Sequence, residues 1–135
     1  MGALWTEEAK FDRWLRVELA ACEAMAELGI IPKSAARAIR KKARVDPKRV
    51  EELEAVTRHD VAAFVQAVGE TVGPEARWFH FGLTSSDVLD TALAMALVDA
   101  ADIIIGDLES LAATVARRAV EHRDTPMIGL SLIHI

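Results

Sequence analysis

The most constraining feature of this chain is one helical pattern that runs over residues 86–122. Its first half is apolar nearly all round, with Val88, Leu89, Leu93, Met95, Leu97, Val98, Ile103, Ile104 and Ile105. At about 1.5 Å per residue the helix would span roughly 55 Å, far more than an average globular helix. A helix with this pattern must be enclosed by other helices, and nothing else in the sequence is long enough to enclose it. We therefore expect the chain either to associate through this helix or to lack part of its bundle.

The long helix is not expected to cross a membrane. Its most apolar window, residues 88–105, contains Asp90, Asp99 and Asp102, and acidic side chains are costly inside a lipid bilayer. The first residues lack the charged-then-apolar pattern of a signal peptide. The lone Cys22 cannot form an internal disulfide, which is typical of a reducing compartment. The sequence therefore predicts a cytoplasmic protein with no membrane contact.

The charge pattern argues against a nucleic-acid partner. The net charge is −5, and one basic run stands out, made of Arg37, Arg40, Lys41, Lys42 and Arg44. A run of this kind on a short helix is typical of a solvated face, whereas nucleic-acid binding needs a larger basic surface.

The rest of the pattern predicts an all-α fold. The sequence is 52% hydrophobic but only 5% aromatic, and it is rich in alanine, which favours helices. Four shorter helices are expected: one that opens at Thr6 and stops at Gly29, one over residues 34–42, one after Asp46 and Pro47, and one over residues 60–72. We expect a small helical domain over residues 1–83, the start of a helical-bundle domain over residues 84–129, and a separate apolar tail over residues 130–135.

Three hydroxyl residues, Thr84, Ser85 and Ser86, stand at the start of the long helix. The first turn of a helix has unpaired N–H groups and the positive end of the helix dipole, so the cluster is a candidate anion site. Thr84 and Asp87 also fit an ordinary capping pattern, and the residues alone favour the cap.

His59 and Asp60 stand at the expected start of the helix over residues 60–72, where polar groups can point into a cleft. The residues alone favour a polar pair at a helix end over a catalytic pair. His80 lies in an aromatic loop, residues 78–82, where a packing role and a site role are equally open.

An ordered set of motifs resembles the adenylosuccinate lyase family, within the fumarase/aspartase superfamily. The motifs are residues 4–11 (LWTEEAKF), 28–32 (LGIIP), 57–64 (TRHDVAAF), 80–92 (HFGLTSSDVLDTA) and 125–129 (TPMIG). The resemblance covers about residues 3–129, and the two central motifs are highly specific. It implies that the long helix is the first helix of the superfamily's central bundle.

The resemblance implies a reaction as well as a fold. Members of the family β-eliminate fumarate from adenylosuccinate and from the succinyl-aminoimidazole-carboxamide ribotide in purine biosynthesis, without a metal or an organic cofactor. The partners implied are a small nucleotide substrate and identical subunits, because the family forms homotetramers whose active sites each draw on three subunits. Such chemistry needs a base, an acid for the departing nitrogen, and pockets for carboxylates and phosphate.

The resemblance also implies roles for individual residues. Thr84 and Ser85 match residues that bind the carboxylate on the fumarate side. Arg58, His59 and Asp60 match a second substrate-binding segment, in which His59 is a general acid or a substrate contact and Asp60 fixes its tautomer or contacts the ligand. His80 matches a further histidine of the active-site region.

The resemblance ends after Gly129. The family continues with Arg-Thr-His-Gly, so Leu132 takes the place of a catalytic histidine, and a leucine side chain cannot transfer a proton. We therefore expect a fragment with a non-native tail and no lyase activity of its own. Two alternatives stay open: another lyase or cycloisomerase of the superfamily, or a non-catalytic helical module that oligomerises through residues 88–105.

Overall fold

The computed structural model describes residues 1–128, and within this range the fold is all-α, as predicted. The α-helices are α1 (Glu7–Glu27), α2 (Lys33–Lys42), α3 (Pro47–Thr57), α4 (Asp60–Val72) and α5 (Ser85–Glu121). Two 3₁₀ helices, η1 (Gly2–Trp5) and η2 (Pro74–Trp78), complete the described part, which contains no strand. The second of them ends at Trp78, where the expected aromatic loop over residues 78–82 begins, and residues 79–82 form a turn.

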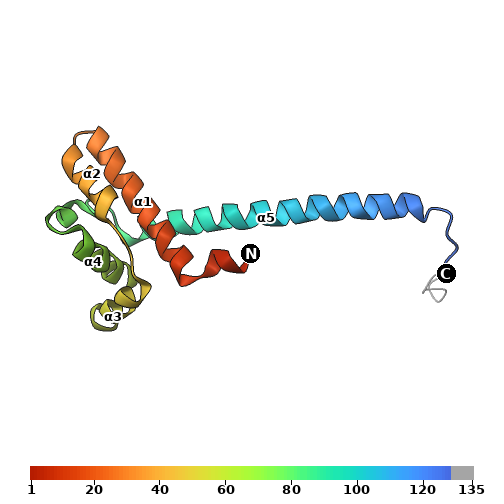
Figure 1. Ribbon diagram of the computed structural model, residues 1–135, viewed down its shortest axis with the longest axis horizontal. Coiled ribbons are helices and arrows are strands. Elements are labelled where there is room, and N and C mark those ends of the chain that lie inside the picture. The colour runs from red at the N-terminus through yellow and green to blue at the C-terminus, as the bar shows by residue number, and fades with distance from the viewer. Residues whose placement is uncertain (129–135) are drawn as a thin grey trace. The chain divides into compact units, whose positions relative to one another are not determined.

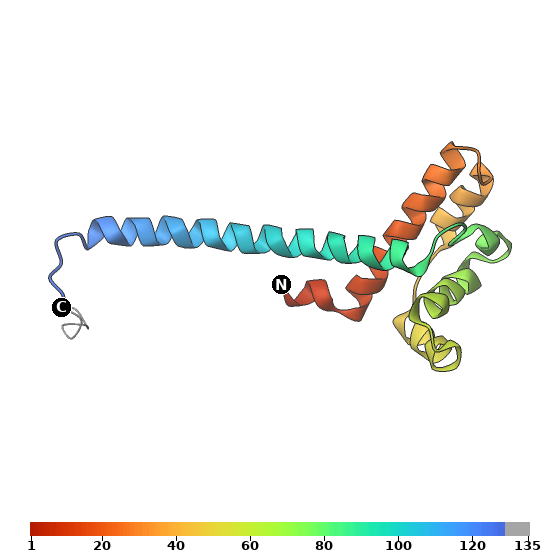
Figure 2. The ribbon, with the colours of Figure 1, turned by 180° about the vertical axis from the view of Figure 1, so that it is seen from behind.

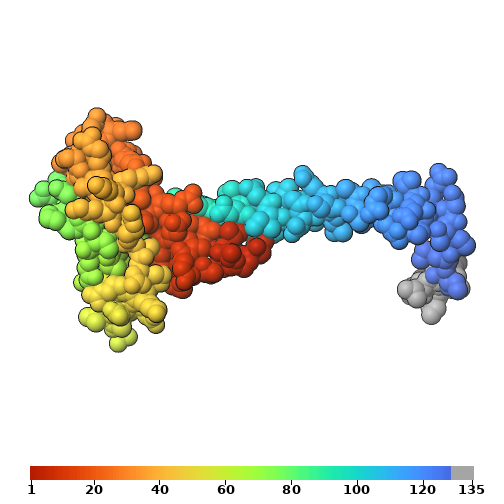
Figure 3. Space-filling view, in the orientation of Figure 1, coloured from red at the N-terminus to blue at the C-terminus, as the bar shows by residue number. Residues whose placement is uncertain are grey.

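The described residues divide into two compact units, Met1–Ala100 and the part that begins at Ala101. Within the first unit α1 packs beside α2, and α3 packs antiparallel beside α4, as both ribbon views show (Figures 1 and 2). In the space-filling view the side chains of α1, α2 and α3 close the gaps that the ribbons leave between them (Figure 3). The domain division expected at residues 83/84 stays a prediction.

Local side-chain caps explain where three helices begin. The Thr6 hydroxyl accepts a hydrogen bond from the Ala9 N–H at 3.2 Å, and the Asp46 carboxylate accepts one from the Lys48 N–H at 3.1 Å. The third cap is His59, whose ring nitrogen Nδ1 accepts from the Ala62 N–H at 3.3 Å. Each cap satisfies a backbone donor that the first turn leaves unpaired. The starts expected at Thr6 and Asp46 are confirmed.

Aromatic rings form the centre of the core of the first unit. Phe64 on α4 is fully buried, and its ring centroid lies 5.4 Å from that of Trp14, 6.0 Å from that of Phe11 and 6.1 Å from that of Phe79. From α1 the apolar side chains of Phe11, Trp14, Cys22 and Ala26 are buried in this core. Aromatic pairs at these separations add to the burial energy, so the core holds α1, α4 and the segment after η2 together.

Two charged residues of α1 are buried in this core, which the apolar pattern did not anticipate. Arg13 is 6% exposed and Glu18 is 0% exposed. The Arg13 guanidinium donates to the Leu4 carbonyl at 2.8 Å and to the Asp99 carboxylate at 3.2 Å, so it ties η1 and α5 to α1. Glu18 contacts His80. Buried charges are tolerated when they are paired in this way.

The long helix α5 begins at Ser85 and ends at Glu121, one residue earlier at each end than expected. The reason for the earlier start is the Asp87 carboxylate, which accepts a hydrogen bond from the Thr84 N–H at 2.8 Å and makes Thr84 the residue before the first turn. In the first unit α5 buries a narrow stripe, Val88, Ala92, Ala96 and Ala100. Its larger side chains Leu93, Leu97 and Val98 are 51–60% exposed.

The second unit begins at Ala101, and its described residues are exposed. Every residue from 101 to 128 is exposed, including the apolar side chains of Ile103, Ile104, Ile105, Leu108, Leu111 and Val115. None of the helices in the described range meets the length and apolarity that a membrane crossing requires. The apolar tail expected over residues 130–135, including Leu132, lies outside the described residues, as does Gly129.

Candidate active site

His59 is held at the start of α4 by its own backbone cap. The turn between α3 and α4 is made by Arg58, whose φ of 56° lies in the left-handed region. Because the Ala62 N–H donates to Nδ1 of His59, that nitrogen must accept, so a neutral His59 carries its proton on Nε2. The other ring nitrogen, Nε2, is thereby a hydrogen-bond donor.

Asp60 and Arg58 lie beside His59 but do not share its surroundings. The Asp60 carboxylate accepts from the Val61 N–H at 2.7 Å, and its Oδ1 lies 3.4 Å from Nδ1 of His59. The hydrogen-bond partner of Nδ1 is thus the Ala62 N–H and not the Asp60 carboxylate. The Arg58 side chain lines a separate surface hollow with Glu51, Glu54 and Ala55. The structure thus places Arg58 apart from His59, and Asp60, although close to the ring, does not line the same pocket as His59.

The start of α5 presents the hydroxyl cluster. The Ser85 side chain is partly buried, whereas Thr84 and Ser86 are exposed. One half of the predicted capping pair forms, because Asp87 accepts from the Thr84 N–H, while the Thr84 hydroxyl has no hydrogen-bond partner among residues 1–128. The capping interpretation is therefore confirmed in part, and the hydroxyl groups remain available to a ligand.

The two motifs meet in one surface pocket. The Nε2 atom of His59 lies 3.4 Å from the Ser85 hydroxyl oxygen, although the two residues are 26 positions apart. The pocket has a volume of about 320 Å³ and also contains His80. Its other lining residues come from α4 and are Val61, Ala62, Val65 and Gln66. Two histidines and a serine hydroxyl at an apolar wall give this pocket groups for hydrogen bonding and proton transfer.

Glu18 supports the pocket from inside the core. Its carboxylate lies 2.5 Å from Nδ1 of His80 and accepts a second hydrogen bond from the His80 backbone N–H at 3.1 Å. Burial raises the pKa of Glu18, and the contacts with His80 oppose that rise. Sequence reasoning missed Glu18, although a signal existed, because Trp14, Glu18, Cys22 and Ala26 follow one another at a spacing of four. An acid within such an apolar stripe indicates a buried partner.

Cys22 lies one turn beyond Glu18 and is 1% exposed. Burial, with the carboxylates of Glu18 and Glu23, raises the pKa of the thiol to about 11. The thiol is thus buried and poorly suited to act as a nucleophile, since a nucleophilic cysteine needs a lowered pKa and access to solvent.

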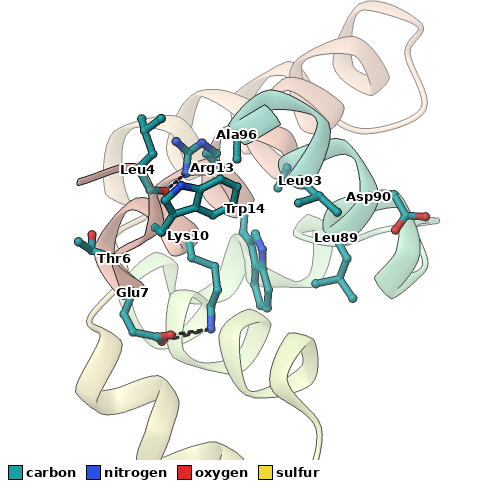
Figure 4. Close-up of a pocket in the computed structure, with 12 residues that line it drawn as sticks. Leu4, Thr6, Glu7, Lys10, Arg13, Trp14, Leu89, Asp90, Leu93 and Ala96 are labelled. Carbon is teal, nitrogen blue, oxygen red and sulfur yellow. Dashed lines mark hydrogen bonds and ion pairs between the residues drawn. The ribbon is translucent and has the colours of Figure 1, made fainter. Parts of the chain in front are cut away.

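A second pocket lies between η1, the first turns of α1 and the first turns of α5 (Figure 4). Trp5, Trp14, Leu89 and Leu93 are among its lining residues. Three charged side chains of this pocket have hydrogen-bond partners. Lys10 donates to the Glu7 carboxylate and Arg13 donates to the Leu4 carbonyl, as the dashed lines in Figure 4 show. None of the site residues predicted from the sequence lines this pocket, so the candidate site is the pocket of His59, His80 and Ser85.

Metal binding finds no support in the described range. Residues 1–128 contain no group of three histidine, cysteine or acidic side chains placed to hold an ion.

Comparison with known proteins agrees with the motifs and with the fold. A family described as lyase matches residues 1–131, which is nearly the whole chain. This chain belongs to the lyase family.

Relatives of this chain include well-matched adenylosuccinate lyases. It is 50% identical over 129 residues to the adenylosuccinate lyase of Bacillus subtilis and 53% identical over 131 residues to that of Synechocystis. The resemblance predicted from the motifs is thereby confirmed. These matches cover 96% and 97% of the chain but only 30% of each relative, so the chain spans about 30% of their length.

Solved structures share the fold of this chain. A fumarate lyase from Mesorhizobium sp. BNC1 superposes with a TM-score of 0.89 at 27% identity, over 98% of this chain and 32% of that one. The 3-carboxy-cis,cis-muconate lactonizing enzyme from Pseudomonas putida superposes with a TM-score of 0.87 at 31% identity, over 96% of this chain and 31% of that one.

Proposed function

We propose that this chain supplies the first part of the substrate site of an adenylosuccinate lyase, a carbon–nitrogen lyase of purine biosynthesis. The reaction would release fumarate from adenylosuccinate and from the related succinyl-aminoimidazole-carboxamide ribotide. Identity of about 50% to adenylosuccinate lyases, against 31% to a lactonizing enzyme, favours this member of the family. The structural observation that carries the proposal is the 3.4 Å approach of His59 Nε2 to the Ser85 hydroxyl.

His59 is proposed to act on the departing nitrogen, as a general acid or as a direct contact. A β-elimination needs a donor there, because the amine leaves with a developing negative charge. The Ala62 N–H occupies Nδ1, so the proton of neutral His59 is on the nitrogen that faces the pocket. This arrangement suits donation to a substrate atom bound beside Ser85.

Thr84 and Ser85 are proposed to bind the carboxylate on the fumarate side. Their hydroxyl groups and the free N–H groups of the first turn of α5 are donors, and the helix dipole favours an anion at this end. The Asp87 carboxylate already engages the Thr84 N–H, so the remaining donors, above all the Ser85 side chain, would do most of the binding. Arg58 and Asp60 are proposed as outer substrate contacts.

Identical subunits are the proposed cover for α5. The exposed apolar side chains of the helix would not stay in water in a stable protein. Three or more further helices are needed to enclose such a surface, and a homotetramer would supply them. We also place the enzyme in the cytoplasm, in keeping with the reduced thiol of Cys22.

A chimera provides the test. Residues 3–129 of this chain would replace the matching segment of the Bacillus subtilis adenylosuccinate lyase, so that the parent enzyme supplies everything after Gly129, and fumarate release from adenylosuccinate would be measured. We expect the chimera to be active, and we expect the 135-residue chain alone to give no turnover.

The chimera also separates the alternatives. A chimera that assembles like its parent but releases no fumarate would contradict the proposal. Size-exclusion chromatography of the chain alone tests the rival, non-catalytic module. A stable, monodisperse oligomer without affinity for adenylosuccinate would favour that rival.

A further inference from the structure

The His80 ring is held by a carboxylate that lies inside the core. Glu18 is 0% exposed, whereas the His80 side chain is 21% exposed and lines the candidate pocket. The contact joins α1 to the segment after η2 across 62 positions of sequence. A buried group thus contacts one edge of the ring while the other edge faces the site.

The backbone of His80 is held by the same carboxylate. Its φ of 61° lies in the left-handed region, which non-glycine residues adopt at a cost. The second carboxylate oxygen of Glu18 accepts the His80 N–H at 3.1 Å. One side chain therefore fixes both the backbone conformation and the ring orientation.

The free edge of the ring ends in Nε2. This atom has no hydrogen-bond partner among residues 1–128. It is also not buried, because the buried side-chain atoms without a partner in that range do not include it. It is therefore open to solvent or to a ligand. Since Nδ1 faces a carboxylate, which only accepts when it is ionised, the proton of a neutral ring belongs on Nδ1.

We propose that Glu18 is a positioning residue of the active site, which holds His80 with its proton on Nδ1 so that Nε2 faces the ligand as an acceptor. The inference concerns the pocket to which we assigned the lyase reaction and in that respect rests on the proposed function. The role of Glu18 is to orient His80, and it does not itself touch the ligand.

In this arrangement the two histidines of the pocket have opposite hydrogen-bonding roles. His59 accepts the Ala62 N–H at Nδ1 and presents a donor, whereas His80 donates from Nδ1 and presents an acceptor. A donor and an acceptor in one pocket match a ligand group that can both accept and donate, such as an amine nitrogen or a hydroxyl. A carboxylate group of the ligand would satisfy only the donor, His59, because its oxygens accept hydrogen bonds and do not donate them.

A purely structural role explains the pair less well. Removing a carboxylate from water is costly even when it is paired, and apolar residues of the same volume often stabilise a core at least as well. The neighbours of Glu18 on the same stripe, Trp14 and Cys22, are apolar and buried. Orientation of the His80 ring explains why this one position of the stripe carries a charged side chain.

Nitrogen-15 NMR of the histidine rings in the whole 135-residue chain tests the proposal without substrate. Long-range proton–nitrogen spectra at a pH where the rings are neutral report which nitrogen carries the proton, and a His80→Gln variant assigns the signals. We expect His80 with its proton on Nδ1, and His59 with its proton on Nε2. A neutral His80 with its proton on Nε2 would overturn the proposal, because Glu18 would then be the donor. The proposal would also be overturned if the His80 ring signals of the chain in buffer equalled those of the chain unfolded in concentrated urea.

A matched pair of variants tests the cause. Glu18→Gln removes the charge and keeps the size, and we expect it to abolish the Nδ1–H preference of His80 while His59 is unchanged. Glu27→Gln makes the same change at an exposed position of α1 and should alter neither histidine. A Glu18→Gln protein that is folded and keeps the Nδ1–H form would overturn the assignment to Glu18.

The chimera links the inference to activity. Glu18→Gln in the chimera should lower kcat by about 10-fold to 100-fold, the range seen when the hydrogen-bonded partner of a metal-binding histidine is removed. An unchanged kcat would overturn the role of Glu18 in the site. An inactive parent chimera would instead contradict the proposed function, and the NMR result on the tautomer would stand independently of it.

Discussion

The Nε2 atom of His59 lies 3.4 Å from the Ser85 hydroxyl oxygen, which joins the start of α4 to the start of α5. The two groups differ in how they are held. Nδ1 of the His59 ring caps α4, whereas the Ser85 hydroxyl contacts His59 and is otherwise free among residues 1–128. Each helix start thus contains groups that cap the helix and a side chain that faces the pocket. Substitutions can separate the capping role from the role in the site.

Substitution of His59 should separate capping from chemistry. Asparagine is a good helix cap but has no second ring nitrogen, so His59→Asn in the chimera should keep stability and lower kcat by about 100-fold or more. His59→Ala should lose the same activity and about 1 kcal/mol of unfolding free energy as well. Fumarate release and urea unfolding measure the two effects. Full activity in the asparagine variant would rule out a proton-transfer role.

Adjacent serines at the start of α5 offer a matched comparison. Ser85→Ala removes the hydroxyl that faces the pocket, and we expect it to raise KM for adenylosuccinate about 10-fold, equivalent to one hydrogen bond to a charged group. Ser86→Ala makes the same change at a neighbouring exposed position and should leave KM unchanged. Steady-state kinetics of the two chimeras decide the matter, and equal KM values would count against a binding role for Ser85.

Glu18 should make stability depend on pH. Burial raises its pKa above 4.5 in the folded chain, so between 4.5 and the folded pKa the native state binds more protons than the unfolded state. The free energy of unfolding therefore falls as pH rises through that window. Urea unfolding at a series of pH values should show this slope, and Glu18→Gln should remove it. A Glu27→Gln protein should keep the slope, and the same slope in all three proteins would refute the assignment.

Cys22 should react slowly in the native state. A pKa of about 11 in place of 9.0 leaves about 100-fold less thiolate at neutral pH, and the side chain is 1% exposed. We expect a disulfide reagent to modify the native chain only through unfolding, and to modify it at once in urea. Absorbance of the released thiol measures both rates. Rapid reaction without denaturant would show that the core around α1 opens.

Local chemistry in the sequence was sufficient to predict the helices. The caps at Thr6 and Asp46 and the stop at Gly29 act within one or two turns, so the sequence alone indicates them. The long helix was predicted to within one residue at each end. The candidate site residues His59 and Ser85 came from motifs and from the resemblance that those motifs carry.

The sequence by itself thus determined the all-α fold, the order of its helices and the family. Only the tertiary structure decided which polar residues meet: His59 with Ser85 in the pocket, Glu18 with His80 behind it, and Arg13 with Asp99. It also placed Arg58 away from the pocket. The physical reason is range, because capping and periodicity act between near neighbours, whereas these pairs span 26 to 86 positions and form only when packed helices bring them together.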